Sequence, residues 1–187
     1  MQGSYEQLPD NLPVPTDDGA CDHLVGMNLP DLPLETTVGK PVNLAREDGR
    51  TVVYCYPMTG QPGVPLPAGW DEIPGARGCT PQSCSFRDHF AELKALGAGL
   101  YGMSTQTTDY QREMAERLHL PYPIISDHQL LFCTELKLPT FVVEGKTLLK
   151  RVTLIAFNGV IEAVHYPVFP SYSDPGWVIA YLQSSSR

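Results

Sequence analysis

The residues best suited to chemistry stand together in the stretch GCTPQSCSFRD, which runs from Gly78 to Asp88. Cys79 follows a glycine-rich loop and comes just before a segment whose apolar residues have helical spacing. Backbone N–H groups at a helix N-terminus lack partners within the helix, and together with the helix dipole they stabilise a negative charge. A cysteine in that place is favoured as a thiolate, which is a nucleophile. We therefore predict that Cys79 is reactive.

A lone cysteine in a sequence is more often a small buried residue than a nucleophile. That interpretation suits Cys55 and Cys133, which lie within apolar runs. It suits Cys79 poorly, because Gly78 and Thr80 flank it.

Cys84 is a second candidate, placed within the same predicted helix. In an intact helix its spacing from Cys79 corresponds to about 140° of rotation and roughly 8 to 9 Å between Cα atoms. A disulfide needs Cα atoms within about 7 Å. The two cysteines therefore cannot form a disulfide unless the first turns of the helix unwind. Cys84 can thus stay separate while Cys79 reacts and bond to it afterwards.

Other chemical groupings are weaker. Cys79, Cys84 and His89 have the spacing C-x4-C-x4-H, which matches no common zinc motif and has no fourth ligand nearby. The chain has no C-x-x-C pair and no glycine-rich phosphate loop, so we expect no ordinary dithiol exchanger, no nucleotide cofactor and no metal. The remaining histidines of interest are scattered, and we expect surface or rim positions for all three: His119, His128 and His165.

The elements that must hold these residues follow from the apolar spacing. Strands are predicted at 51–56, 99–104, 139–143, 151–157 and 160–166. Helices are predicted from about residue 80, from about 107, over 128–138 and after Asp174. Strands alternate with helices in the first part of the chain. Near its end, Asn158-Gly159 forms a hairpin turn between the strands at 151–157 and 160–166. This order predicts an α/β fold with a mixed central sheet flanked by helices.

The helix after Cys79 is predicted to have Thr80 as its N-cap and Pro81 in its first turn. Its apolar face is formed by residues at helical spacing: Phe86, Phe90, Leu93 and Gly97. Because this face begins beyond both cysteines, we expect the first turn to be weakly packed and to unwind at little cost.

The composition is that of one ordinary folded domain of 187 residues. We expect residues 1–24, rich in Pro, Asp and Gly, to form an extended arm, and residues 25–187 to form a single domain. A formal net charge of -8 disfavours nucleic acid and anionic membranes as partners. The first residues have no basic start and no apolar core, so we expect no secretory signal. Five unevenly spaced cysteines favour a reducing compartment, and we expect the cytoplasm.

The stretch from Pro57 to Gly78 carries five prolines and five glycines and has no periodicity. A loop of this length is uncommon in a compact domain and is usually functional or disordered. Trp70, with Leu66, Ile73 and Val64, gives it apolar residues to hold it in place. We predict that it is a lid or a partner surface.

The stretch around Cys79 resembles the active-site helix of the peroxiredoxins, and most closely the Q type, also called bacterioferritin comigratory proteins. Their pattern P-G-C-T-x-x-x-C-x-x-R-D corresponds to Gly78-Cys-Thr-Pro-Gln-Ser-Cys84 followed by Arg87-Asp88. Five further stretches resemble the family's opening hairpin, its first core strand, its next strand and its L-P-F-P-x-x-S-D turn, in the same order: 29–34 with 39–44, 52–57, 101–105 and 120–127.

This resemblance implies a thioredoxin-like fold, a peroxidatic cysteine at Cys79 and a resolving cysteine at Cys84. It implies that Arg151 opens a strand and holds the thiolate, a role that suits a guanidinium with its fixed charge and several donors. The resemblance also implies that thioredoxin or a similar dithiol recycles the protein and that it needs no metal or organic cofactor. We expect a monomer or a weak homodimer.

The sequence departs from the family motif P-x-x-x-T/S-x-x-C just before Cys79. The residue three positions earlier is Ala76, which has no hydroxyl, and the nearest candidate is Thr59, beyond a long insertion. If Thr59 folds back against Cys79, the insertion is a flap beside a normal pocket. If it does not, peroxide turnover should be slow. A second, shorter addition covers 144–149.

Three functions were weighed on these residues. The first is a thiol peroxidase that reduces hydrogen peroxide and organic hydroperoxides through Cys79 and Cys84. The second is a peroxide sensor or redox-switched binding module that uses the same pair, with the long loop as its docking surface. The third is a thioredoxin-fold structural protein whose cysteines are incidental.

Overall fold

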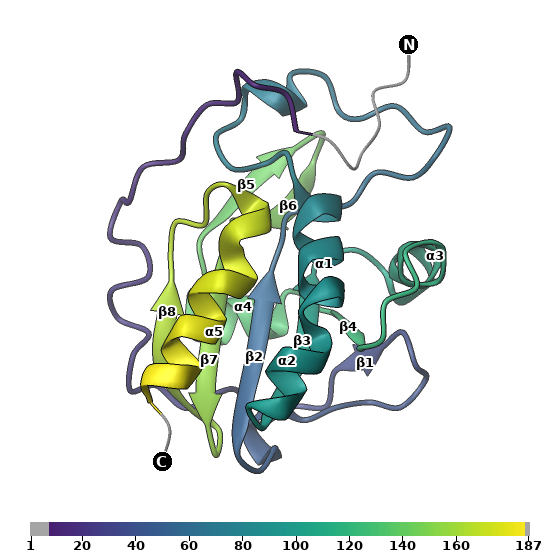
Figure 1. Ribbon diagram of the computed structural model, residues 1–187. Helices are drawn as coiled ribbons and strands as arrows, with labels where there is room; N and C mark the ends of the chain where they lie inside the picture. Colours follow the sequence, from purple (N-terminus) through teal and green to yellow (C-terminus); the bar gives the residue numbers. More distant parts are fainter. Residues whose placement is uncertain (1–7, 186–187) are drawn as a thin grey trace.

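The computed structural model describes residues 8–185 and consists of a mixed sheet with helices on both faces (Figure 1). Its central sheet has six strands in the order β1-β4-β3-β2-β7-β8. Strands β2, β3 and β4 are parallel, and β7, β8 and β1 pair antiparallel with their neighbours. The strands are β1 (Glu35–Thr36), β2 (Arg50–Cys55), β3 (Ala98–Ser104), β4 (Ile124–Ser126), β7 (Val152–Phe157) and β8 (Val160–His165). This is the α/β architecture that the sequence predicts.

Strand β2 is the centre of the molecule, and its sequence explains why. Val52 and Tyr54 point into the apolar cluster on one face of the sheet, and Val53 and Cys55 point into the cluster on the other. All four residues are at most 1% exposed. A strand buried on both faces must be apolar throughout, which the run TVVYCY is.

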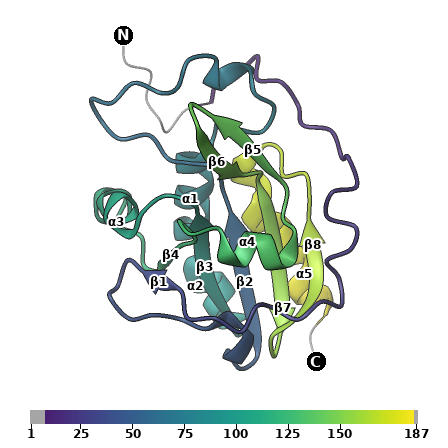
Figure 2. The same cartoon turned by 180° about the vertical axis from the view of Figure 1, so that it is seen from behind.

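The helices lie in two layers. Figure 1 shows α1, α2 and α5 across one face of the sheet, and Figure 2 shows α4 on the opposite face. The helices are α1 (Cys79–Asp88), α2 (Phe90–Ala95), α3 (Thr108–Arg117), α4 (Leu131–Leu136) and α5 (Asp174–Ser184), with short 3-10 turns at Leu44–Arg46, Trp70–Glu72 and Ser171–Ser173. Among the described residues, no helix is both long and apolar enough to cross a membrane.

Two predictions about the helix after Cys79 are wrong. The N-cap is Gly78 rather than Thr80, which lies inside the first turn. The helix also breaks at His89, so that Phe86 belongs to α1 whereas Phe90 and Leu93 belong to α2. Gly97 does not lie on the apolar face: it follows the end of α2 with a φ of 77°, where a residue without a Cβ is favoured.

The segment that the sequence suggested as an addition at 144–149 forms a strand of its own. β5 (Thr140–Val143) and β6 (Lys146–Leu149) make a separate two-stranded antiparallel sheet that turns at Glu144 and Gly145. Figure 2 shows this hairpin beside the 57–78 loop, at one end of the central sheet. Positive φ angles at both turn residues suit a tight hairpin.

The N-terminal segment runs along the β8 edge of the sheet (Figure 1). Its residue Asp18 accepts a 2.8 Å hydrogen bond from Tyr166 and pairs with Lys150 at 2.8 Å. Cys21 and Leu24 are buried in the apolar core. Residues 1–7 of the predicted arm lie outside the described part of the chain, and the boundary at residue 24 stays a prediction.

Candidate active site

The first turn of α1 carries Cys79, and Gly78 makes that turn possible. Gly78 has a φ of 114°, a backbone conformation that favours glycine. A Cβ at this position would collide with the Ser171 hydroxyl and press on Leu8. The chain therefore turns sharply into the helix, and Cys79 becomes its first residue.

Arg151 holds the sulfur of Cys79. Its Nη2 lies 3.3 Å from Cys79 Sγ, and the same nitrogen donates to the carbonyls of Gly75, Ala76 and Arg77 at 3.1 to 3.4 Å. Both side chains are buried, with Arg151 4% and Cys79 3% exposed. One guanidinium therefore fixes the loop before the helix and places its own positive charge beside the sulfur. These two predicted site residues meet although they are far apart in the sequence.

Thr59 also reaches the site. It lines a cavity of about 10 Å³ together with Cys79. Its backbone N–H and hydroxyl donate to Gln106 Oε1 at 3.0 and 3.4 Å, and its carbonyl accepts from Tyr110 at 3.1 Å. Thr59 and Cys79 thus border one cavity although most of the 57–78 loop separates them in the sequence, and the role of the Thr59 hydroxyl stays a prediction.

The 57–78 loop covers this cavity. Leu66 and Trp70 are part of the cavity wall, and Trp70 is 3% exposed. Trp70 packs against Phe141 of the β5–β6 hairpin, with a distance of 6.2 Å between the two ring centroids. Ile73 joins the same apolar cluster, whereas Val64, expected to help, is 47% exposed. The cavity has room for little more than one water molecule.

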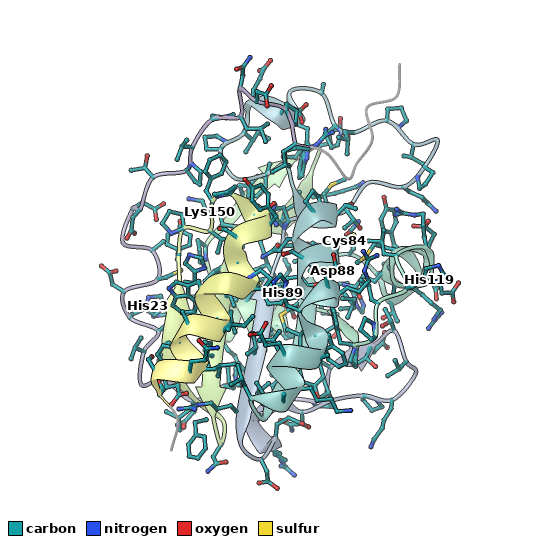
Figure 3. All side chains as sticks on the ribbon, viewed as in Figure 1. His23, Cys84, Asp88, His89, His119 and Lys150 are labelled. Atoms are coloured by element: carbon teal, nitrogen blue, oxygen red, sulfur yellow. The ribbon has the colours of Figure 1, made fainter. Side chains whose placement is uncertain are left out.

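Cys84 lies apart from Cys79 on the same helix. Neither cysteine forms a disulfide. In Figure 3, Cys84 projects from the side of α1 that faces α3. It is half-buried and borders an open groove of about 740 Å³, which Leu12 and Tyr172 also line. Joining the two sulfurs therefore requires α1 to unwind.

The expectation that the first turns of α1 are weakly packed is wrong. Residues 79–83 are all buried. Tyr122 donates to the Ser83 carbonyl at 2.7 Å, and Tyr54 donates to its hydroxyl at 3.0 Å. Tyr54 reaches the helix because it passes Gly102, where any Cβ would collide with its ring. Unwinding this part of α1 breaks buried hydrogen bonds, each of which contributes about 0.5–1.5 kcal/mol.

A polar network behind Arg151 was not anticipated. Gln82 accepts from Arg151 Nη1 and donates from Nε2 to Asp174 Oδ2 at 2.7 Å. His165, expected at the surface or rim, is half-buried and bonds to Asp174 Oδ1 through Nδ1 at 2.8 Å. The spacing of three residues between Cys79 and Gln82 was a usable signal, because it places both on one helix face. Nothing in the sequence marked Asp174, which only the fold brings to α1.

The other thiols differ from the candidate pair. Burial raises the pKa of Cys21 to about 12 and that of Cys133 to about 11, and it raises the pKa of Cys55 well above its usual range. All three stay protonated at neutral pH and lie in one apolar cluster. His89 does not join a metal site, and its ring Nδ1 bonds to the Ser85 carbonyl at 2.8 Å.

The family model of the Redoxin family matches residues 24–176. Among curated proteins, the chain is 30% identical over 160 residues to the chloroplastic peroxiredoxin Q of Sedum lineare, covering 85% of this chain and 77% of that protein. It is 28% identical to the chloroplastic peroxiredoxin Q of Oryza sativa subsp. japonica, covering 85% of this chain and 66% of that protein.

Solved structures share the fold. The peroxidoxin BcpB of Mycobacterium tuberculosis superposes with a TM-score of 0.71 at 24% identity, covering 87% of this chain and 98% of that one. The bacterioferritin comigratory protein of Xanthomonas campestris, whose alkyl peroxide reduction has been described, superposes with a TM-score of 0.66 at 18% identity, covering 95% and 100% of the two chains. These likenesses show the thioredoxin-like peroxiredoxin fold.

Proposed function

Since this chain belongs to the Redoxin family and is a peroxiredoxin of the Q type, and so a thiol peroxidase, we propose that Cys79 is its peroxidatic cysteine and Cys84 its resolving cysteine. The observation that carries the proposal is the 3.3 Å contact between Arg151 Nη2 and Cys79 Sγ at the start of α1. A buried sulfur beside a guanidinium and a helix N-terminus is stabilised as a thiolate.

The first step is attack of the Cys79 thiolate on one oxygen of the peroxide. The S–O bond forms as the O–O bond breaks, the sulfur is oxidised to a sulfenic acid, and the other oxygen leaves as water or an alcohol once protonated. Arg151 donates to the reacting atoms and offsets the charge that moves onto the leaving oxygen. Its place is fixed by the three loop carbonyls of residues 75–77.

Thr59 is the proposed hydroxyl of the pocket. Its side chain is 1% exposed and borders the same cavity as the thiol. Gln106 and Tyr110 hold its backbone, so the hydroxyl is fixed without help from the residues just before Cys79. A fixed hydroxyl positions the peroxide for in-line attack.

The second step joins the cysteines. The Cys84 thiolate attacks the sulfenic sulfur of Cys79, the S–S bond forms as the S–O bond breaks, and the oxygen leaves as hydroxide, which takes up a proton to become water. Thioredoxin or a similar dithiol then reduces the disulfide by exchange and becomes oxidised itself. We propose that the protein works as a monomer or weak homodimer in a reducing compartment such as the cytoplasm, which five cysteines outside any disulfide support.

A peroxide sensor is the second candidate function. The buried first turn of α1 favours it, because that packing slows a catalytic cycle that depends on unwinding the helix. A sensor would use the same two cysteines and pass its oxidation to a partner. Turnover separates the two functions, since a peroxidase consumes many equivalents of peroxide per chain when a dithiol is supplied.

The test is peroxide consumption with thioredoxin and its reductase, using the wild type, Cys79→Ser and Cys84→Ser. We expect many turnovers for the wild type, none for Cys79→Ser, and a single peroxide consumed per chain for Cys84→Ser. Cys133→Ala is the matched control and should keep turnover. If Cys79→Ser retains activity and Cys84→Ser loses the first step, the two roles are reversed.

A further inference from the structure

Asp174 is a carboxylate with no contact to solvent. It is 0% exposed, and it opens α5, which lies with α1 on the same face of the sheet. Three groups bond to it: Gln82 Nε2 at 2.7 Å, Thr153 Oγ1 at 2.6 Å and His165 Nδ1 at 2.8 Å. Burying a carboxylate is costly even when it is fully hydrogen-bonded. An apolar residue would fill this place at lower cost, so the charge calls for a reason.

The reason lies in the direction of the hydrogen bonds. An arginine only donates and an ionised carboxylate only accepts, whereas a glutamine amide has one end of each kind. With Arg151 on one side and Asp174 on the other, Gln82 has a single satisfied orientation, in which Oε1 faces Arg151 and Nε2 faces Asp174. Asp174 therefore fixes which end of the amide the guanidinium meets.

The opposite orientation would face Arg151 with an NH₂ group. Two donors would then meet in a buried space, and the guanidinium would be pushed from its place beside Cys79 Sγ. We propose that Asp174 is a positioning residue of the peroxidatic site, acting through Gln82 to hold Arg151 against the sulfur. The proposal rests on the function assigned to Cys79 above.

His165 and Thr153 hold the carboxylate itself. Thr153 and Gln82 both donate to Asp174 Oδ2, and His165 bonds to Oδ1. Hydrogen bonds to both oxygens therefore hold the carboxylate group in one orientation. The imidazole is fixed in turn by stacking on Trp177, with ring centroids 4.6 Å apart. The network thus extends from the rim of α5 to the thiol.

The test uses two single variants and one double variant. Asp174→Ala removes the acceptor, so the Gln82 amide loses its fixed direction. Gln82→Glu places two carboxylates in hydrogen-bond contact, where they repel. In Gln82→Glu/Asp174→Asn, the new carboxylate still accepts from Arg151, and the new amide donates to it in the reverse direction. The control is Glu162→Gln, which removes a carboxylate of β8 that pairs with Arg50 of β2.

Two quantities are measured: the second-order rate constant with hydrogen peroxide, and the pH profile of Cys79 alkylation, which needs no peroxidase activity. We expect each single variant to lose roughly ten- to a hundredfold in rate, as for a displaced catalytic group, and to move the alkylation profile to higher pH. The double variant should regain most of the rate that Gln82→Glu loses, and Glu162→Gln should match the wild type.

The proposal is overturned if Asp174→Ala lowers the melting temperature but leaves the alkylation profile in place. It is also overturned if Asp174→Asn fails to improve the Gln82→Glu variant, a comparison that stands even if Asp174→Ala does not fold. If the wild type consumes no peroxide, the assigned function fails, whereas the alkylation profiles still decide the role of Asp174.

Discussion

Cys79 and the three core cysteines show how environment divides one residue type into two roles. Cys79 lies against a guanidinium at a helix N-terminus. Cys21, Cys55 and Cys133 lie in an apolar cluster without a cationic partner of that kind, and burial raises the pKa of each. Thiol reactivity depends on the fraction present as thiolate, so these three are packing residues at neutral pH.

This division predicts selective labelling of the native protein. At pH 8, iodoacetamide should modify Cys79 and Cys84 and leave Cys21, Cys55 and Cys133 intact, as mapped by mass spectrometry. In denaturant, all five should react. Rapid native labelling of Cys55 would contradict the assignment.

The same pKa shifts predict loss of stability in alkali. The folded pKa values of about 12 for Cys21 and 11 for Cys133 lie above the ordinary value of 9.0. Their contribution to the free energy of unfolding is therefore complete below pH 9 and is lost as the pH rises towards 11 to 12. Urea titrations between pH 8 and pH 11 should show this decline, and Cys21→Ala/Cys133→Ala should flatten it. A decline of equal size in the double variant would assign it to other groups.

At the scale of elements, the 57–78 loop borders the cavity and packs against the β5–β6 hairpin. Trp70 is the central contact between them, because it borders the cavity on one side and packs on Phe141 on the other. The cavity of about 10 Å³ is too small for an aryl or long alkyl group unless the loop moves.

Trp70→Ala should therefore change selectivity. We expect kcat/KM for cumene hydroperoxide to rise about tenfold relative to that for hydrogen peroxide, a size typical of one pocket contact. Val64→Ala, in the exposed part of the same loop, is the matched control and should change neither value. An equal change for both peroxides in Trp70→Ala would show that the side chain acts on folding and not on selectivity.

We expect helix α1 to set the rate of the proposed second step, because its anchored first turns must open before Cys84 can reach Cys79. Tyr122→Phe removes the 2.7 Å hydrogen bond to the Ser83 carbonyl. A hydrogen bond contributes about 0.5–1.5 kcal/mol, so disulfide formation after oxidation should speed up roughly two- to tenfold. Rapid-quench mass spectrometry measures that rate. The control is Tyr101→Phe, which loses a hydrogen bond to Glu47 far from α1 and should leave the rate of disulfide formation unchanged. An unchanged rate in Tyr122→Phe would mean that opening of α1 does not limit disulfide formation.

The strands and the start of α1 were predictable because their signals are local. The run at 51–56, the Asn158-Gly159 turn and the glycine before Cys79 each fix a backbone by their own residue types. The packing of the first turn of α1 was not predictable, since its partners Tyr54, Tyr122 and Asp174 come from three distant segments. Apolar spacing alone missed it because the contacts are polar.

At the scale of the whole molecule, segments distant in sequence enclose Arg151. The N-terminal segment contributes Pro15 and Asp18, the 57–78 loop contributes Pro74, and the β5–β6 hairpin contributes Phe141 to a cavity of about 340 Å³ that Arg151 lines. Leu8 also lies close to Gly78. The described part of the N-terminal segment is thus packed onto the rear of the site.

Asp18 ties that segment down, and its pKa predicts when the tie fails. Hydrogen bonds from Lys150 and Tyr166 lower the pKa of Asp18 from 3.8 to about 2. The carboxylate therefore stabilises the attachment above pH 3.8, and this contribution is lost as the pH falls through 2. Asp18→Asn should loosen the segment already at pH 7, seen as faster amide exchange in residues 9–20. Asp31→Asn, which breaks an exposed pair with Arg46, should not, and equal exchange in both variants would rule out the tie.

We expect oxidation to join Cys79 to Cys84 within one chain, which peptide mapping after one equivalent of hydrogen peroxide tests. One dominant cross-linked peptide should contain both residues, in a protein that remains monomeric on a non-reducing gel, and amide exchange should be faster over residues 79–85. A dominant bond from Cys79 to Cys21, Cys55 or Cys133, or between two chains, would contradict it and leave Cys84 as a packing residue.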